Sequence, residues 1–286
     1  MKKIVGILLF MAILASCSGV KSADEKKIFV TIEPLKGLVE ELTCGDYSIE
    51  VLVPSGASPE SYEPSSKQIA SLSDAELIVE VGLIDFEHTL THHINDRSRI
   101  INVSQGIKLI EGSCSHHHHS SADHHHGIDP HIWTSPQALK VVVHNISEAL
   151  IKHYPDSTKY AEAAQGIITR LDSLDAYCAK RIAESNTEAM MIYHPAYTYL
   201  ARDYNIEQIS IEHEGKEPTP RQLTTLISAA RKHNIRRIFF QPQYNPDKLR
   251  ALADEIDAEI TMCNPLNADI EAEILNIVDL MTRNDE

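Results

Sequence analysis

The sequence predicts an α/β protein of two parallel-sheet βα lobes, joined by a long rigid backbone helix, with a binding site in the cleft between the lobes. Three observations predict this fold class. Short apolar runs alternate with helical patterns in both halves of the chain. A proline-free stretch with helical periodicity separates the halves. Loops rich in proline follow several of the apolar runs, where open α/β sheets bind their ligands.

Each half of the chain holds four apolar runs that we expect to form strands. In the first half these are Ile28–Ile32, Ile49–Val53, Leu77–Val81 and Ile100–Val103, and in the second half they are Ala189–Tyr193, Ile206–Ile211, Arg237–Phe240 and Glu259–Met262. Helical segments such as Gln222–His233 and Asp247–Ile256 lie between them. Strands separated by helices imply parallel βαβ units. We therefore expect an N-terminal lobe over 28–155 and a C-terminal lobe over 187–286.

Between the two expected lobes, the alternation of strands and helices gives way to a long helical pattern. Pro136 suits the first turn of a helix that runs to about His153, and Pro155 then interrupts it. Segment 156–186 has no proline, and its apolar positions lie on one helical face: Ile167, Leu171, Leu174, Cys178 and Ile182. A helix of roughly 30 residues is about 45 Å long. We expect this connecting helix to restrict hinge motion, and the alternative is two shorter helices within one domain.

The N-terminus indicates export. Lys2 and Lys3 precede an apolar run that is too short to span a bilayer, which is typical of a secretory signal. The run ends in LASC, which resembles the lipobox of bacterial lipoproteins and makes Cys17 the lipidated residue. We expect a signal peptide at 1–17 and a polar tether at 18–27. The protein would then lie on the periplasmic or cell-surface side, attached to the membrane only through this lipid.

Charge and cysteine content narrow the class of ligand. The chain has 26 Lys and Arg against 41 Asp and Glu, a net charge of −15, which argues against nucleic acid and is compatible with a cation. The cysteines after the lipobox have no CxxC spacing, so a structural zinc knot is not expected. Cys178 and Cys263 are candidates for a disulfide, which the sequence leaves open. Cys114 sits beside a histidine run and is a candidate to join it in holding metal.

The histidine run lies between Glu111 and Gly127, within EGSCSHHHHSSADHHHG. Its histidines are His116, His117, His118, His119, His124, His125 and His126. The remaining residues are small or acidic and cannot form a core, so we expect a mobile loop over 115–126. We hypothesise that this loop scavenges metal for the cleft or senses its abundance.

Three proline-braced loops carry side chains that suit a metal site. The first loop, after the second expected strand, offers Glu60 or Glu63. The second contains His131, and the third contains His194 at the end of a strand. Imidazole nitrogen and carboxylate oxygen are ligands that zinc accepts, and a cleft between lobes can bring distant segments together. Asp129 stands two residues before His131 and is placed to orient its imidazole.

The chain resembles the zinc- and manganese-binding solute receptors of bacterial ABC importers, the cluster that includes the ZnuA-like receptors. The resemblance covers nearly everything from Ile28 to Leu280, through the motifs PSGASPESYEP, DPHIWTSP, YHPAYTYLARDY, EGKEPTP and FFQPQYNPDKL. It implies two α/β lobes joined by a rigid helix and one metal ion in the cleft, without catalysis. It also implies a membrane permease as the partner and a monomeric receptor.

Carried over position by position, the resemblance gives metal ligands at Glu60, His131 and His194. Glu60 departs from the family pattern, in which a histidine usually follows the proline. Asn264 is a second departure, because manganese-binding relatives tend to have an aspartate there. The fourth ligand is left open between water, a second oxygen of Glu60, and Asn264 itself. His213 is a further candidate for that position, with a surface histidine as the other interpretation.

Ligand preference favours Zn²⁺ over Mn²⁺. Two neutral histidines and one carboxylate leave a divalent ion with a net charge of about +1, fewer anions than a hard manganese site collects. A manganese receptor of the same family is the alternative.

Two competing functions belong to other classes: a zinc-dependent hydrolase, which also uses two histidines and a glutamate, and a metal buffer whose whole function is the histidine loop. We expect no enzyme, because HExxH, GxSxG and P-loop motifs are absent from the sequence.

Overall fold

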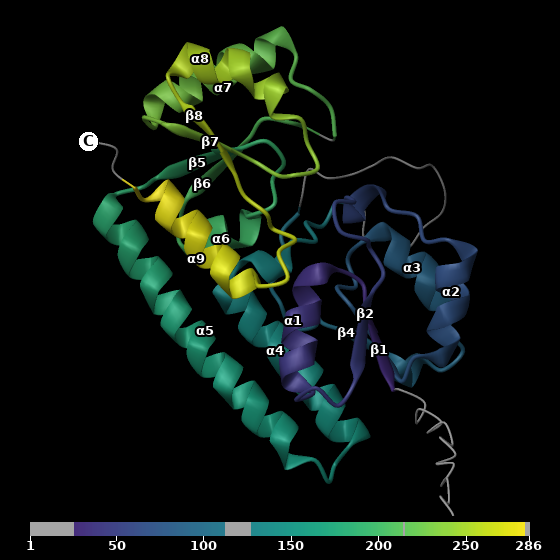
Figure 1. Ribbon diagram of the computed structural model, residues 1–286. Helices are drawn as coiled ribbons and strands as arrows, with labels where there is room; N and C mark the ends of the chain where they lie inside the picture. The colour runs from purple at the N-terminus through teal and green to yellow at the C-terminus, as the bar shows by residue number, and fades with distance from the viewer. Residues whose placement is uncertain (1–25, 112–126, 214, 284–286) are drawn as a thin grey trace, which may run out of the picture.

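The computed structural model describes residues 26–111, 127–213 and 215–283. Two α/β lobes, each built on a four-stranded parallel sheet, are connected along one side by a pair of long helices (Figure 1). The predicted fold class is confirmed. The strand order is β2-β1-β3-β4 in the first sheet and β6-β5-β7-β8 in the second. The two sheets thus repeat one topology, and open α/β sheets bind their ligands at loops beyond the carboxyl ends of their strands.

The N-terminal lobe alternates strands and short helices. Its strands are β1 (Lys27–Val30), β2 (Ser48–Val51), β3 (Leu77–Glu80) and β4 (Ile100–Asn102). Its helices are α1 (Glu33–Leu42), α2 (Ser66–Ser71) and α3 (Asp85–His92), with 3-10 turns η1 (Pro59–Ser61), η2 (Leu72–Asp74), η3 (Arg97–Arg99) and η4 (Ile132–Thr134). Each strand lies within one or two residues of its expected position. Strands β1 and β3 are almost wholly buried and are mainly apolar runs for that reason.

The C-terminal lobe repeats the pattern. Its strands are β5 (Ala189–Ile192), β6 (Glu207–Ser210), β7 (Arg237–Phe240) and β8 (Glu259–Met262). Its helices are α6 (Thr198–Asp203), α7 (Pro220–Lys232), α8 (Arg250–Ile256) and α9 (Ile270–Met281), with the 3-10 turn η5 (Pro246–Leu249) before α8. Helix α7 begins with a capping box, in which the side chains of Thr219 and Gln222 each accept a hydrogen bond from the other's backbone N–H.

Two long helices connect the lobes. Helix α4 (Pro136–His153) packs against α5 (Thr158–Ser185), a single helix of 28 residues. Helix α5 ends at Ser185, and the next residue, Asn186, adopts the left-handed conformation (φ 55°) that stops many helices. Figure 1 shows α5 running along one side of the molecule, from its turn after α4 to the start of the C-terminal lobe.

The apolar core is continuous between the lobes. Strand β5 alternates its side chains between two clusters, with Met190 and Ile192 facing one and Ala189 and Met191 facing the other. The first cluster extends through α4, α5 and α9 into the N-terminal lobe, whereas the second lies under α7 and α8. The lobes are therefore fastened by packing as well as by the covalent connection.

The described cysteines, Cys44, Cys178 and Cys263, are all free. Cys178 and Cys263 are buried and form no disulfide, which answers the question that the sequence left open. Cys114, the histidine loop 115–126, Cys17, the signal 1–17 and most of the tether lie outside the described residues. Among the helices that the structure describes, none has the length and apolar character that crossing a membrane requires.

Candidate metal centre

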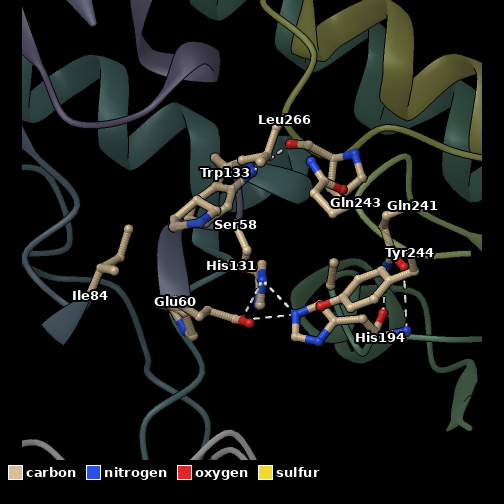
Figure 2. A pocket seen from close by; sticks show the side chains of 14 residues that line it. Ser58, Glu60, Ile84, His131, Trp133, His194, Gln241, Gln243, Tyr244 and Leu266 are labelled. Carbon is tan, nitrogen blue, oxygen red and sulfur yellow. Dashed lines mark hydrogen bonds and ion pairs between the residues drawn. The ribbon is translucent and has the colours of Figure 1, made fainter. Parts of the chain in front are cut away.

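The side chains of Glu60, His131 and His194 converge between the lobes. One ligand atom from each lies within 4.8 Å of the others, and within the described parts of the chain this is the one such group of three or more histidine, cysteine or acidic side chains. Figure 2 shows the carboxylate and the two rings pointing toward one another. Glu63, the alternative from the first loop, is exposed, whereas the Glu60 side chain is only 14% exposed.

The separations between these atoms approach those of a tetrahedral zinc site. The Nε2 atoms of His131 and His194 are 3.4 Å apart, and His131 Nε2 lies 3.3 Å from Glu60 Oε1. Four ligands at zinc's usual bond lengths stand about 3.3–3.4 Å from one another at tetrahedral angles. The third separation, 2.8 Å from His194 Nε2 to Glu60 Oε1, is shorter and must widen to admit an ion. The donor set thus fits zinc with a small adjustment.

Glu60 comes from a short, proline-led turn. Pro59 opens the turn η1, and its fixed φ and missing N–H suit that position. Glu60 Oε1 is buried and has no aligned hydrogen-bond donor, although both imidazoles are near it. Burial opposes ionisation of this carboxyl group, but contacts with His131 and His194 outweigh it and hold its pKa well below the usual 4.5. A buried anion without an aligned donor is the partner that a cation needs.

His131 is fixed by Asp129, as the sequence predicted from their spacing. Asp129 Oδ1 accepts hydrogen bonds from the backbone N–H of His131 and from its ring Nδ1, both at 2.9 Å. Tyr199 donates to the Asp129 carbonyl at 2.7 Å, which secures the loop. Burial acts to lower the pKa of His131, but the charge and hydrogen bond of Asp129, assisted by Glu60, raise it to about 10.

His194 lies two residues beyond β5 and is held by two side chains that the sequence analysis missed. Glu212 Oε1 is 2.7 Å from His194 Nδ1, and the Gln241 amide donates to the His194 carbonyl at 2.7 Å. The Tyr244 ring stacks on the imidazole at a centroid distance of 5.8 Å. Burial opposes protonation of His194, yet the carboxylates of Glu212 and Glu60 raise its pKa.

A cavity of about 30 Å³ adjoins the three side chains. That volume holds one or two water-sized groups. Both lobes supply its apolar walls, including Ile84 and Trp133 from the first and Leu266 from the second. The Trp133 indole donates to the Pro265 carbonyl at 2.7 Å and so ties the two walls together. The low polarity of these walls strengthens the attraction between a bound cation and its ligands.

Neither candidate for the fourth ligand joins the group. The Asn264 amide oxygen accepts a hydrogen bond from the Leu266 backbone N–H, and Asn264 lines a separate, larger pocket next to the cavity. His213 is exposed and lies outside the converging group, while the residue before it, Glu212, is the one that reaches the site. The signal for Glu212 was present in the sequence, since it directly follows an expected strand just as His194 does.

Two parallel-sheet lobes joined by long helices, with two imidazoles and a carboxylate buried between them, define a metal-binding solute receptor. The family model described as zinc-uptake complex component A periplasmic, ZnuA, matches residues 28–286, and the chain belongs to this family.

Individual relatives agree with that placement. The high-affinity zinc uptake system protein ZnuA of Bacillus subtilis (strain 168) is 29% identical over 98% of this chain and 93% of that protein. The zinc-binding lipoprotein AdcA of Streptococcus pneumoniae (strain ATCC BAA-255 / R6) is 29% identical over 99% of this chain, which spans only 60% of AdcA. A crystal structure of ZnuA superposes with a TM-score of 0.80 at 29% identity, covering 90% of this chain and 98% of that one.

Proposed function

We propose that this protein is an extracytoplasmic zinc receptor, which binds one Zn²⁺ ion in the cleft and delivers it to the membrane permease of an ABC importer. The observation that carries the proposal is the buried convergence of the Glu60 carboxylate with the imidazoles of His131 and His194. The family and the names of the relatives support the same cargo. Zinc is here the transported solute, so the site must both hold it and give it up.

The donor set supports zinc over manganese. Two neutral imidazoles are borderline ligands that suit zinc, whereas manganese prefers more oxygen donors. Glu60 supplies one carboxylate, and the fourth position is available to its second oxygen or to water. Because Asn264 binds the Leu266 backbone, it is a poor candidate for that position. Zinc tolerates four ligands, so a water molecule completes the proposed site.

Calorimetry of the mature protein with Zn²⁺ and with Mn²⁺ tests the proposal. We expect one tight zinc site and weaker manganese binding, and we expect Glu60→Ala, His131→Ala and His194→Ala each to weaken the tight site. His213→Ala is the matched control, because that imidazole is exposed and outside the group. Unchanged tight binding in all three cleft variants would instead support the histidine-loop buffer.

We also propose that the receptor has no catalytic role, although zinc hydrolases use a similar donor set. The size of the cavity supports this, because about 30 Å³ holds only one or two water-sized groups beside the ion. The zinc-loaded protein should not turn over ester, peptide or phosphoester substrates. Turnover that His194→Ala abolishes would contradict the receptor function.

Anchoring through Cys17 completes the proposed function. The LASC sequence supports lipidation, and one relative carries the name lipoprotein. Cys17→Ser should move the protein from the membrane fraction to the soluble fraction of cells, without changing the zinc affinity of the purified body. Retention of the variant in the membrane fraction would rule out this anchor.

A further inference from the structure

We propose that Glu212 is a positioning residue of the cleft site, which fixes the His194 ring with Nε2 directed at the metal ion. This inference rests on the proposed zinc function and extends it to a residue that touches no ion. Glu212 Oε1 lies 2.7 Å from His194 Nδ1, and both side chains are buried, at 5% and 7% exposure. Because an ionised carboxylate only accepts hydrogen bonds, the proton of this contact is on Nδ1. The lone pair of a neutral His194 ring is then on Nε2, the atom that faces Glu60.

Strand register explains why Glu212 stands beside His194. In the C-terminal sheet, Ile192 of β5 is paired with Ser210 of β6. His194 is two residues beyond the first partner, and Glu212 is two residues beyond the second. Parallel strands that continue in register keep such positions adjacent and on the same face, since side chains alternate with a period of two. The Glu212 backbone N–H donates to the Tyr193 carbonyl at 3.0 Å, which extends the ladder to this point.

The third strand of the set contributes in the same way. Ile192 is also paired with Phe239 of β7, and Gln241 is two residues beyond Phe239. Gln241 is 1% exposed and donates its amide N–H to the His194 carbonyl at 2.7 Å. Three adjacent strands therefore hold one ligand: β5 presents His194, β7 fixes its backbone through Gln241, and β6 fixes its ring through Glu212. Such support leaves the imidazole little rotational freedom before the ion arrives.

Glu212 completes a symmetry between the lobes. Asp129 bonds His131 Nδ1 at 2.9 Å from the N-terminal side of the cleft, as Glu212 bonds His194 Nδ1 from the other. Each lobe thus carries one imidazole whose Nε2 is presented by a buried carboxylate. A carboxylate in this position also makes the ring a stronger donor, and its loss typically lowers metal affinity by about 10–100-fold.

The simpler explanation is that Glu212 merely balances charge in a buried region. Glu212→Gln separates the two roles, because its side-chain oxygen still accepts from Nδ1–H although the negative charge is gone. Glu212→Ala removes both, and Glu212→Asp keeps the charge but shortens the side chain so that it no longer reaches the ring. Glu207→Gln is the matched control, since Glu207 is exposed at the opposite end of the same strand.

The experiment measures zinc affinity by chelator competition on the full chain and follows the His194 Nδ1–H signal by NMR of ¹⁵N-histidine-labelled, zinc-loaded protein. We expect an affinity loss of about 10–100-fold in Glu212→Ala and Glu212→Asp, a loss below about tenfold in Glu212→Gln, and none in Glu207→Gln. The hydrogen-bonded Nδ1–H signal should persist in Glu212→Gln and disappear in Glu212→Ala. If Glu212→Ala does not fold, the zinc affinities of Glu212→Asp and Glu212→Gln are compared with each other and with that of the wild-type protein.

Two results overturn the inference while leaving the proposed function intact: wild-type affinity in Glu212→Ala or Glu212→Asp, or losses in Glu212→Gln as large as those in Glu212→Ala. The latter would assign Glu212 to charge balance alone. Failure of the wild-type protein to bind zinc tightly would instead reject the proposed function itself, so the two failures are distinguishable.

Discussion

Three buried carboxylates surround two imidazoles at the cleft, and this composition determines how the site responds to protons. Glu60, Asp129 and Glu212 all lie within hydrogen-bond distance of a histidine ring nitrogen or close to it. In the metal-free protein, the second proton on His131 offsets part of this negative charge. A divalent ion takes the place of ring protons, so zinc and protons compete for one position.

Zinc affinity should therefore rise with pH. The pKa of His131 is raised to about 10, so this ring carries a second proton at neutral pH in the metal-free protein, and the pKa of His194 is raised from its ordinary value as well. Zinc must displace the second proton of His131, and apparent affinity should increase about tenfold per pH unit for each proton displaced. Calorimetry in buffers of different ionisation enthalpy measures the number released. Zinc binding with no proton release at neutral pH would contradict this protonation state.

The stability of the metal-free protein should change with pH in the opposite direction. A histidine whose folded pKa lies above its unfolded value of 6.5 contributes stability that is fully present below that value. This contribution is lost as pH rises from 6.5 toward 10, so the melting temperature measured in chelator should fall over that interval. His131→Gln should flatten the trend, and a slope identical to wild type would exclude His131 as its source.

Glu60 should affect the relative affinity of the site for Zn²⁺ and Mn²⁺. A histidine at this position would replace a hard oxygen donor with a borderline nitrogen donor. We expect Glu60→His to retain tight zinc binding and to weaken Mn²⁺ binding by about tenfold or more, as judged by parallel titrations. Equal losses for both metals would show that the side chain acts through charge or shape rather than through donor type.

At the residue scale the sequence predicted the three converging side chains and one of their supports, Asp129, but neither Glu212 nor Gln241. Glu60, His131 and His194 stood out because prolines flank them at the ends of strands, and Asp129 stood out by its spacing from His131. Glu212 lies in EHEGKE, which looks like an ordinary charged surface loop. Glu212 directly follows an expected strand, but its burial beside His194 depends on the register between β5 and β6, which the positions of the strands do not specify.

At the scale of elements, helix α1 lies against the segment that leads from β8 to α9. A Cβ added at Gly37 would stand 2.8 Å from the Ala268 carbonyl oxygen, closer than packed atoms allow. The neighbouring residues of this segment, Pro265 and Leu266, form part of the cavity wall. The close approach of α1 thus helps to set the position of one wall of the metal site.

A pair of glycine substitutions tests that contact. Replacing an interior helical glycine by alanine ordinarily stabilises by about 1 kcal/mol. Gly166→Ala in α5 should do so and raise the melting temperature by roughly 2–4 °C, because no atom lies within 4 Å of the added Cβ. Gly37→Ala should lower the melting temperature instead, since forced overpacking costs about 1–3 kcal/mol.

Thermal melts in chelator measure both variants, and zinc titration of Gly37→Ala should reveal weaker binding through the displaced wall. Stabilisation of Gly37→Ala equal to that of Gly166→Ala would mean that this contact carries no strain.

Elements were predicted more completely than their contacts. Strands β7 and β8 begin and end at the expected residues. Strand β7 is a mostly buried run that ends in two aromatic residues, and such a run marks a strand clearly. The Pro136 start of α4 was visible for a similar local reason. The close approach of Gly37 to Ala268 joins distant segments, and nothing local in either segment indicates it.

At the scale of the whole molecule, the continuous core constrains how zinc leaves. The first apolar cluster joins the N-terminal lobe to α5, α9 and one face of the second sheet, so a wide separation of the lobes would expose much apolar surface. Separation of the lobes to release zinc therefore costs free energy, and we expect binding to the permease to supply it and open the cleft.

The histidine loop should be dispensable for the tight site. Deletion of 115–126 removes seven imidazoles but none of the three cleft ligands. We expect the deletion to remove weak zinc sites while sparing the tight one, measured by calorimetry beside the full chain. Loss of all tight binding would refute the division between a scavenging loop and a binding cleft.

X-ray absorption at the zinc edge of this deletion variant, loaded with one equivalent of metal, tests the central claim most directly. The account predicts two imidazole nitrogens at about 2.0–2.1 Å, with oxygen atoms completing a four-coordinate shell. His131→Ala should reduce the imidazole count to one. A shell containing sulfur, more than two imidazoles or none would contradict a zinc site built by Glu60, His131 and His194.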